Sequence, residues 1–149
     1  MCSAPTLQLR ALRGATTATA NTREAIHEAV AELIEALMER NGLEGTRVLS
    51  VTFSVTADLD ACFPAAVARR RQGWSGVALL DCQQMAVAGD LPRCIRLLAH
   101  VWLEPGREAI HPYLREASRL RPDRAAAEES PAQPASPPTT PATGAELSC

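Results

Sequence analysis

A single long amphipathic helix, predicted between Asn21 and Asn41, constrains the fold more than any other feature of this sequence. Asn21 followed by Glu24 is typical of a helix start with a capping box, and Asn41-Gly42 is typical of a helix end. The apolar residues between them recur at helical spacing, and they are Ile26, Val30, Leu33, Ile34, Leu37 and Met38. A helix with this pattern has to bury its apolar face against a second layer.

Strand-like segments lie on both sides of the helix in the sequence. Alternating or β-branched residues predict strands at residues 7–12, 46–56, 76–81 and 94–103. Pro64 suits the first turn of a short helix that stops at Gly73. Residues 110–120 fit a fifth strand or a mixed segment, because Pro112 lacks the N–H that a regular strand needs. The predicted fold is of the α/β type, with a sheet of four or five strands packed by one long helix.

Composition divides the 149-residue chain into one folded domain and a tail. The domain comprises residues 7–124, and residues 1–6 form a short N-terminal arm. From residue 125 onward the chain is rich in Pro, Ala, Ser and Thr and contains no Val, Ile, Phe, Trp or Tyr. Such a segment cannot bury enough apolar surface to offset the entropy of ordering, so residues 125–149 are predicted to be disordered.

The number of helices also bears on assembly. One long helix cannot cover both faces of a sheet of four or five strands. A sheet face that remains apolar and uncovered is commonly buried against another subunit. Oligomerisation is therefore predicted from the pattern of elements.

Charge and motif content exclude several classes of function. The net charge of −2 gives no basic field for nucleic acid or an anionic membrane. Five irregularly spaced cysteines, with no signal-peptide pattern and no apolar run long enough to span a bilayer, predict reduced thiols in a cytoplasmic protein. Phosphate-loop, dinucleotide-binding, serine-hydrolase and zinc-protease motifs are missing from the sequence, and no cofactor or metal is predicted.

Arginines beside the predicted strands are the candidate functional residues. Arg13 follows the first strand, Arg96 lies near the start of the strand at 94–103, and Arg121 ends the folded part. Asp81 ends the third strand, and Tyr113 is the only tyrosine. Because a guanidinium is rarely buried without a partner, these residues together predict a pocket with excess positive charge. Such a pocket suits a small ligand that carries carboxylates.

Six short motifs, taken in order, resemble the AroH class of chorismate mutases, which are monofunctional enzymes of the trimeric α/β-barrel type. The motifs are RGATT at 13–17, ADLDACFPA at 57–65, GW at 73–74, CIR at 94–96, the tyrosine at 113 and LRPD at 120–123. Each motif alone is weak. The ordered set, at compatible spacing over nearly all of residues 7–123, is specific.

The resemblance implies a fold, an assembly and a reaction. The fold would be a five-stranded mixed sheet packed by one long helix, and three subunits would form a pseudo-α/β-barrel. The active sites would lie in clefts between adjacent subunits of this homotrimer. The reaction would be the Claisen rearrangement of chorismate to prephenate, on the route to phenylalanine and tyrosine, without a cofactor.

The resemblance also implies roles for individual residues. Arg13 would hold a substrate carboxylate, Arg96 would bond the ether oxygen, and Tyr113 would meet the side-chain carboxylate. The segment from Leu80 to Gln84, which includes Cys82 and Gln83, would line the ring. The residues implied to come from a neighbouring subunit are Phe63, Ala65 and Arg69, and those of the closing C-terminal segment are Leu120 and Arg121.

Three positions depart from the family pattern. The usual catalytic glutamate falls on Gln84, and a cysteine three residues earlier falls on Asp81. We interpret these two departures as compensatory, with the carboxylate moved to Asp81. A lysine of the family falls on Ala66, and its charge would be replaced by Arg70 or Arg71.

Two alternatives to a working mutase follow from these departures and from the predicted fold. One is a catalytically weakened protein that binds chorismate or a related diacid. The other is a hydrolytic enamine/imine deaminase with a similar trimeric barrel. Fold likeness alone does not separate them, and the CIR and LRPD motifs favour the mutase.

Overall fold

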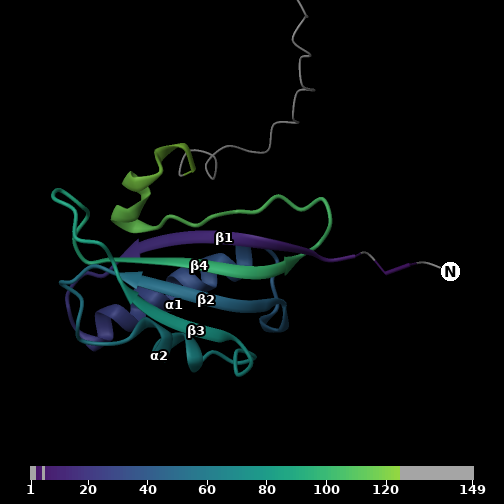
Figure 1. Ribbon diagram of the computed structural model, residues 1–149, viewed down its shortest axis with the longest axis horizontal. Helices are drawn as coiled ribbons and strands as arrows, with labels where there is room; N and C mark the ends of the chain where they lie inside the picture. The colour runs from purple at the N-terminus through teal and green to yellow at the C-terminus, as the bar shows by residue number, and fades with distance from the viewer. Residues whose placement is uncertain (1–2, 5, 125–149) are drawn as a thin grey trace, which may run out of the picture.

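A four-stranded sheet with helices on one face organises the computed structural model, which describes residues 3–4 and 6–124 (Figure 1). The strands lie in the order β1-β4-β2-β3, and their bounds are β1 (Gln8–Thr17), β2 (Val48–Val55), β3 (Ala78–Gln83) and β4 (Cys94–Leu103). Strand β4 is antiparallel to β1 and β2, whereas β2 and β3 are parallel. The sheet is therefore mixed, as predicted. The tail predicted to be disordered lies outside the described residues.

Helices α1 (Arg23–Arg40) and α2 (Pro64–Arg69) pack on the same face of the sheet (Figure 1). The face of α1 predicted from its apolar spacing is the buried one. It meets strand residues such as Leu12, Val51 and Phe53, none of which has any exposed surface. Burial of each large aliphatic side chain contributes about 1.5–3 kcal/mol, so this layer holds the domain together.

The start of α1 differs by one residue from the prediction. Thr22, not Asn21, is the N-cap, and its hydroxyl accepts a hydrogen bond from the N–H of Ala25 at 3.1 Å. The Asn21 side chain reaches the loop after β2 instead. Its Nδ2 donates to Asp60 at 2.7 Å, and its Oδ1 accepts from the N–H groups of Asp60 and Ala61. Asn21 therefore does not cap the helix, because its side chain is bonded to the loop after β2.

Two strands also extend further than predicted. Strand β1 continues to Thr17, because the small residues after Arg13 keep the register with β4. Arg13 thus lies inside a strand and not at its end. Strand β3 runs from Ala78 to Gln83, so Asp81 is also inside a strand. Strand β4 has the predicted bounds.

The predicted fifth strand is not formed. Tyr113 makes only an isolated bridge to Ala15, in which Ala15 donates to the carbonyl of Pro112 and accepts from the N–H of Leu114. Arg115 then has a φ of 53°, which turns the chain out of an extended path into a 3-10 helix, Arg115–Leu120. Pro112 has no N–H to donate to a strand ladder, and Arg115 has a left-handed backbone. Together they end the pairing with β1.

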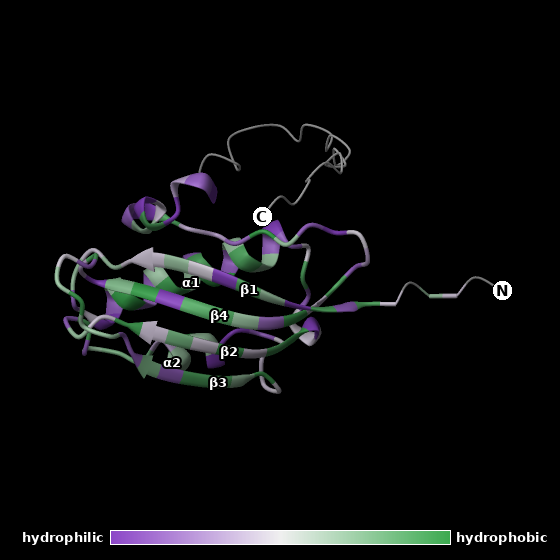
Figure 2. Ribbon diagram, turned by 45° about the horizontal axis from the view of Figure 1, so that its top comes forward, coloured by the Kyte–Doolittle hydropathy of each residue, from purple (hydrophilic) through white to green (hydrophobic). Residues whose placement is uncertain are grey.

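Neither α1 nor α2 covers the second face of the sheet (Figure 2). Large apolar side chains on it remain exposed, with exposed fractions of 54% for Leu9, 58% for Leu80, 41% for Leu98 and 36% for Trp102. We call these four residues the open-face patch. Within the described residues, no helix is long and apolar enough to cross a membrane.

Candidate active site

A small cavity beside the middle of β1 brings together most of the arginines singled out from the sequence. It has a volume of about 190 Å³ and is lined by Arg13, Gly14, Ala15, Arg96, Tyr113, Leu120 and Arg121. Ala15 pairs with Arg96 in the β1–β4 ladder, and both Arg13 and Arg96 project from the open face of the sheet. Three guanidinium groups and a phenol on one cavity suit a ligand with carboxylates. We call it the arginine cavity.

The loop before Tyr113 fixes the backbone of Arg13. The backbone N–H of Arg13 donates a hydrogen bond to Nδ1 of His111 at 2.9 Å. Burial and, after it, the charges of Arg124, Arg121, Arg13 and Arg10 lower the pKa of His111. A neutral imidazole can accept this hydrogen bond, whereas a protonated one cannot. The cationic surroundings therefore keep His111 in the form that supports β1.

The segment that carries Leu120 and Arg121 is held in place by Arg115. Its guanidinium donates to Glu32 at 2.8 Å and to the carbonyl of Thr17 at 3.1 Å, and it also contacts Glu28. The hydrogen bond with Glu32 is the main cause of a raised pKa of Arg115. The 3-10 helix is thereby tied to both α1 and the end of β1. This contact brings Leu120 and Arg121 to the arginine cavity.

Arg121 itself is paired with Asp123 through two hydrogen bonds, at 3.1 and 2.9 Å. This pairing is the first cause of a raised pKa of Arg121, which also interacts with Tyr113. The guanidinium therefore remains at the rim of the cavity with its charge intact.

Arg96 has one carboxylate partner, Asp90. The Nη2 atom of Arg96 donates to Oδ1 of Asp90 at 2.8 Å, and the two side chains are 24% and 20% exposed. Burial acts against the charge of Arg96, but the contacts with Cys94 and Asp90 outweigh it, so the pKa of Arg96 is raised. Its Nε is buried and has no hydrogen-bond partner among the described residues.

Gln84 lies on the same side of the sheet as Arg96. Its Oε1 accepts a hydrogen bond from the hydroxyl of Ser54, and Ser54 pairs with Arg96 in the β2–β4 ladder. Gln84 and Asp90 both line a depression of about 400 Å³ next to the loop that joins β3 to β4.

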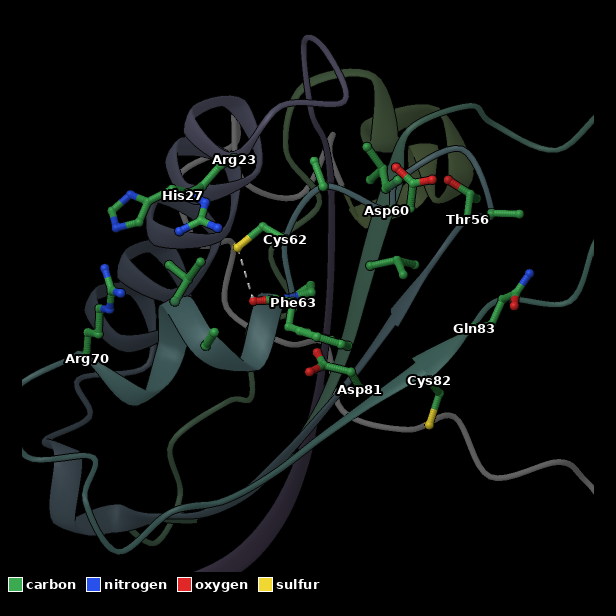
Figure 3. A pocket seen from close by; sticks show the side chains of 17 residues that line it. Arg23, His27, Thr56, Asp60, Cys62, Phe63, Arg70, Asp81, Cys82 and Gln83 are labelled. Carbon is green, nitrogen blue, oxygen red and sulfur yellow. Dashed lines mark hydrogen bonds between the residues drawn. The ribbon is translucent and has the colours of Figure 1, made fainter.

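A second and larger cleft, of about 620 Å³, lies between α1, α2 and the ends of β2 and β3 (Figure 3). Four of its lining residues were predicted from the sequence, namely Phe63, Asp81, Cys82 and Gln83. Phe63 is 72% exposed, and Ala66 and Arg70 also line the cleft. We call it the helix cleft.

Ala65, Arg69 and Leu80 were predicted as site residues but do not line the helix cleft. Ala65 is buried and gives its backbone N–H to Asp81, Arg69 is exposed, and Leu80 belongs to the open-face patch.

Asp81 and Gln84 point to opposite faces of the sheet. Asp81 pairs with the buried Phe53 and therefore faces the helices, where its Oδ1 accepts from the N–H of Ala65 at 3.0 Å. Burial raises the pKa of Asp81, although this hydrogen bond and the charge of Arg69 act in the other direction. Within one protomer, Asp81 is thus not a neighbour of Gln84 and Arg96.

The structure divides most of the predicted site residues into two groups, and Ala65, Arg69 and Leu80 line neither space. One surrounds the arginine cavity and the adjacent depression, and the other surrounds the helix cleft. Sequence reasoning missed Asp90, His111 and Arg115, which support the first group. Arg115 lies two residues after Tyr113, and this proximity was the one signal in the sequence. His111 contacts Arg13 across 98 positions, and Asp90 lies in the loop between β3 and β4, so neither role is visible in a local pattern. Among the described residues, no cluster of His, Cys, Asp or Glu could hold a metal ion.

The part of the chain that contains these residues is similar to known chorismate mutases. The family model described as chorismate mutase type I matches residues 9–124. Over 118 residues the chain is 46% identical to chorismate mutase AroH of Thermus thermophilus, a match that covers 77% of this chain and 95% of the relative. It is 36% identical over 118 residues to chorismate mutase AroH of Bacillus subtilis (strain 168), covering 78% and 93%. A solved chorismate mutase from Clostridium thermocellum has a TM-score of 0.69 and 39% identity, covering 74% of this chain and 99% of its own.

Proposed function

The chain belongs to the type I chorismate mutase family, and from this premise we propose that it converts chorismate to prephenate at a site shared between the subunits of a homotrimer. The single observation that carries the proposal is the arginine cavity, where Arg13, Arg96, Tyr113 and Arg121 converge. The family match favours a mutase over the enamine/imine deaminase.

The rearrangement is unimolecular, so the protein has to select a conformer and stabilise charge. One C–O bond of chorismate breaks while one C–C bond forms in the same molecule, and no proton is transferred. Arg13 and Tyr113 hold substrate carboxylates and bring the reacting carbons together. Leu120 and Arg121 close the cavity over the substrate. No nucleophile or general base is needed.

Arg96 has the main electrostatic role in this proposal. Negative charge builds on the ether oxygen as the C–O bond breaks, and the guanidinium of Arg96 faces that oxygen. An interaction that strengthens in the transition state lowers the barrier more than one made equally in the ground state. Arg96 therefore acts mainly on turnover.

Two observations support the trimer. The open-face patch is apolar and carries no helix, as expected of a surface buried against another subunit. The predicted site residues fall into two groups on different sides of one protomer. A neighbouring subunit that covers the open face would bring its helix cleft, with Phe63 and Asp81, to the arginine cavity, together with Arg69, whose charge acts on Asp81. Asp81 would then supply its carboxylate from the neighbour's side of the site, together with Cys82 and Gln83.

The location in the cell is also a proposal. Cys62, Cys82 and Cys94 are free thiols in the described part of the chain, which supports the cytoplasm that the cysteine pattern predicts.

The activity is tested by following the loss of chorismate absorbance with purified protein and the formation of prephenate. Turnover well above the uncatalysed rate supports the proposal, and it requires no added cofactor. Tight binding without turnover would identify the weakened binding protein instead. The variant Arg47→Lys is a matched control for the arginine substitutions. Arg47 pairs with Glu104, and neither residue lines the arginine cavity, so this variant should keep full turnover.

The shared site is tested by mixing two inactive variants, Arg96→Ala and Arg69→Ala, under conditions that allow subunit exchange. Each variant damages a different half of the site. If a site combines halves from two subunits, about one quarter of the sites in random trimers contain both intact halves, and activity returns. No recovery, or a fully active monomer by light scattering, would contradict the shared site.

A further inference from the structure

Among the described residues, Arg96 has one charged partner, Asp90, besides its contact with Cys94. Its guanidinium lines the arginine cavity, whereas its carboxylate partner Asp90 lines the depression next to that cavity. The contact between them is a charge-assisted hydrogen bond of 2.8 Å from Nη2 to Oδ1. Because Nε has no partner among the described residues, this bond is the charged restraint on the plane of the guanidinium, beside the contact with Cys94.

Asp90 is itself fixed before any substrate is present. Its N–H donates to the carbonyl of Val87 at 3.1 Å, in a turn where Gly89 has a φ of 81°. Its Oδ1 also accepts from the N–H of Leu91 at 2.8 Å. The carboxylate thus has a set direction, because Oδ1 accepts from both Leu91 and Arg96. A group with these restraints can transmit a fixed orientation to its partner.

We propose that Asp90 is a positioning residue, which holds the guanidinium of Arg96 so that its free edge faces the breaking C–O bond. The inference rests on the proposed function, since it assigns Asp90 a part in that reaction. It does not make Asp90 a substitute for Gln84 or Asp81, because Asp90 contacts Arg96 and does not itself line the arginine cavity.

Two opposing effects of the ion pair have to be compared. The negative charge of Asp90 reduces the potential that Arg96 offers to the ether oxygen. Both side chains are mostly buried, with 24% and 20% of their surface exposed, so solvent screens this cost only in part. A misplacement of about 1 Å at a reacting centre, in contrast, can cost about a hundredfold in rate. Orientation therefore outweighs the loss of potential, and the pair favours turnover.

The test compares steady-state kinetics of Asp90→Ala and Asp90→Asn with the wild type. Asp90→Ala removes the acceptor, so kcat should fall by about tenfold or more while KM changes by less than about threefold. Asp90→Asn keeps an oxygen that can accept from Nη2, so its loss should be smaller. Glu104→Gln removes a carboxylate from another arginine pair, Arg47–Glu104, and should leave kcat unchanged.

A double-mutant cycle separates positioning from a general structural effect. In an Arg96→Lys background, the guanidinium that Asp90 orients is gone, so Asp90→Ala should have little further effect on kcat. Melting temperatures of all variants are measured in parallel. An equal loss from Asp90→Ala in both backgrounds would overturn the inference.

Another result would also overturn it. If Asp90→Ala lowers KM and leaves kcat unchanged or higher, Asp90 competes with the substrate for Arg96 and does not position it. If the wild type itself does not convert chorismate, the proposed function fails, and that failure is visible before any variant is compared.

Discussion

The backbone N–H of Arg13 donates a hydrogen bond to Nδ1 of His111, across 2.9 Å and 98 positions of sequence. The bond joins the middle of β1 to the segment that leads to Tyr113. It places two candidate binding residues relative to each other through a side chain that was not singled out from the sequence. It also makes this part of the site sensitive to pH.

Stability should fall as the pH is lowered through the histidine range. Burial and nearby arginines lower the pKa of His111 in the folded state. The unfolded chain therefore takes up a proton first, near the ordinary histidine value of about 6.5, and unfolding becomes easier as the pH falls from there to the lower folded pKa. Melting temperatures from about pH 8 to about pH 5 measure the effect.

The variant His111→Asn keeps an acceptor near the position of Nδ1 but does not titrate. It should show a shallower fall of melting temperature over the same range. A slope equal to that of the wild type would exclude His111 as the cause.

Replacing Arg96 with lysine should reduce turnover by about a hundredfold or more, the usual scale for the loss of one preorganised donor. Lysine keeps the charge but loses the planar fork that bonds Asp90 and faces the ether oxygen. KM should change much less, because the interaction strengthens chiefly in the transition state. Steady-state kinetics measure both constants. A purely raised KM with normal kcat would contradict the role of Arg96.

Asp81→Asn tests whether the carboxylate moved from the position of Gln84. Turnover should fall by about a hundredfold, and Gln84→Glu should restore much of it in that background. In the wild-type background Gln84→Glu should help little, because nearby carboxylates repel each other. Additive effects in kcat across the four proteins would reject the relocation. Because the two residues face opposite sides of one protomer, rescue would also require a shared site.

The same variant separates catalysis from stability. The raised pKa of Asp81 means that its ionised form is less favourable in the folded than in the unfolded state. This group stabilises the fold only when protonated, and the contribution is lost as the pH rises through the folded pKa. Asparagine removes the charge and keeps an acceptor for Ala65, so the melting temperature at neutral pH should not fall. A marked fall would indicate a structural role.

Arg70, and not Arg71, should replace the charge that is missing at Ala66. Arg70 lines the helix cleft at the end of α2 opposite Phe63 (Figure 3). Arg71 is bound to Glu35 at 2.8 Å. Arg70→Ala should raise KM several-fold, on the scale of about 1 kcal/mol for a partly exposed charge contact. Arg71→Ala is the matched control and should leave KM unchanged. The reverse pattern would assign the charge to Arg71.

Arg115→Ala should weaken closure of the C-terminal segment. Its contacts with Glu32 and Thr17 hold the 3-10 helix that leads to Leu120 and Arg121. KM should rise by about tenfold, because two or three charge-assisted bonds are lost. Arg119→Ala, in the same helix but with an exposed ion pair to Glu116, should have little effect. Equal effects of the two variants would show that Arg115 has no special role.

The sequence by itself determined the elements that depend on local periodicity. The apolar face of α1, the start of α2 at Pro64 and the bounds of β4 follow from spacing and from proline geometry, which act over a few residues. The uncovered face of the sheet follows from the presence of one long helix, whereas the mixed strand directions were implied by the family resemblance. The ordered motifs indicated the family, which the comparison confirmed.

Only the tertiary structure decided which residues share a space. The pairing with β4 extended β1 past Arg13, and the turn at Arg115 prevented a fifth strand. The faces of Asp81 and Gln84, and the contact between Asp90 and Arg96, depend on register and on a loop. These contacts form because a buried polar group needs a hydrogen-bond partner. The partner is supplied by whichever segment the fold brings close, and the local sequence does not indicate which segment that is.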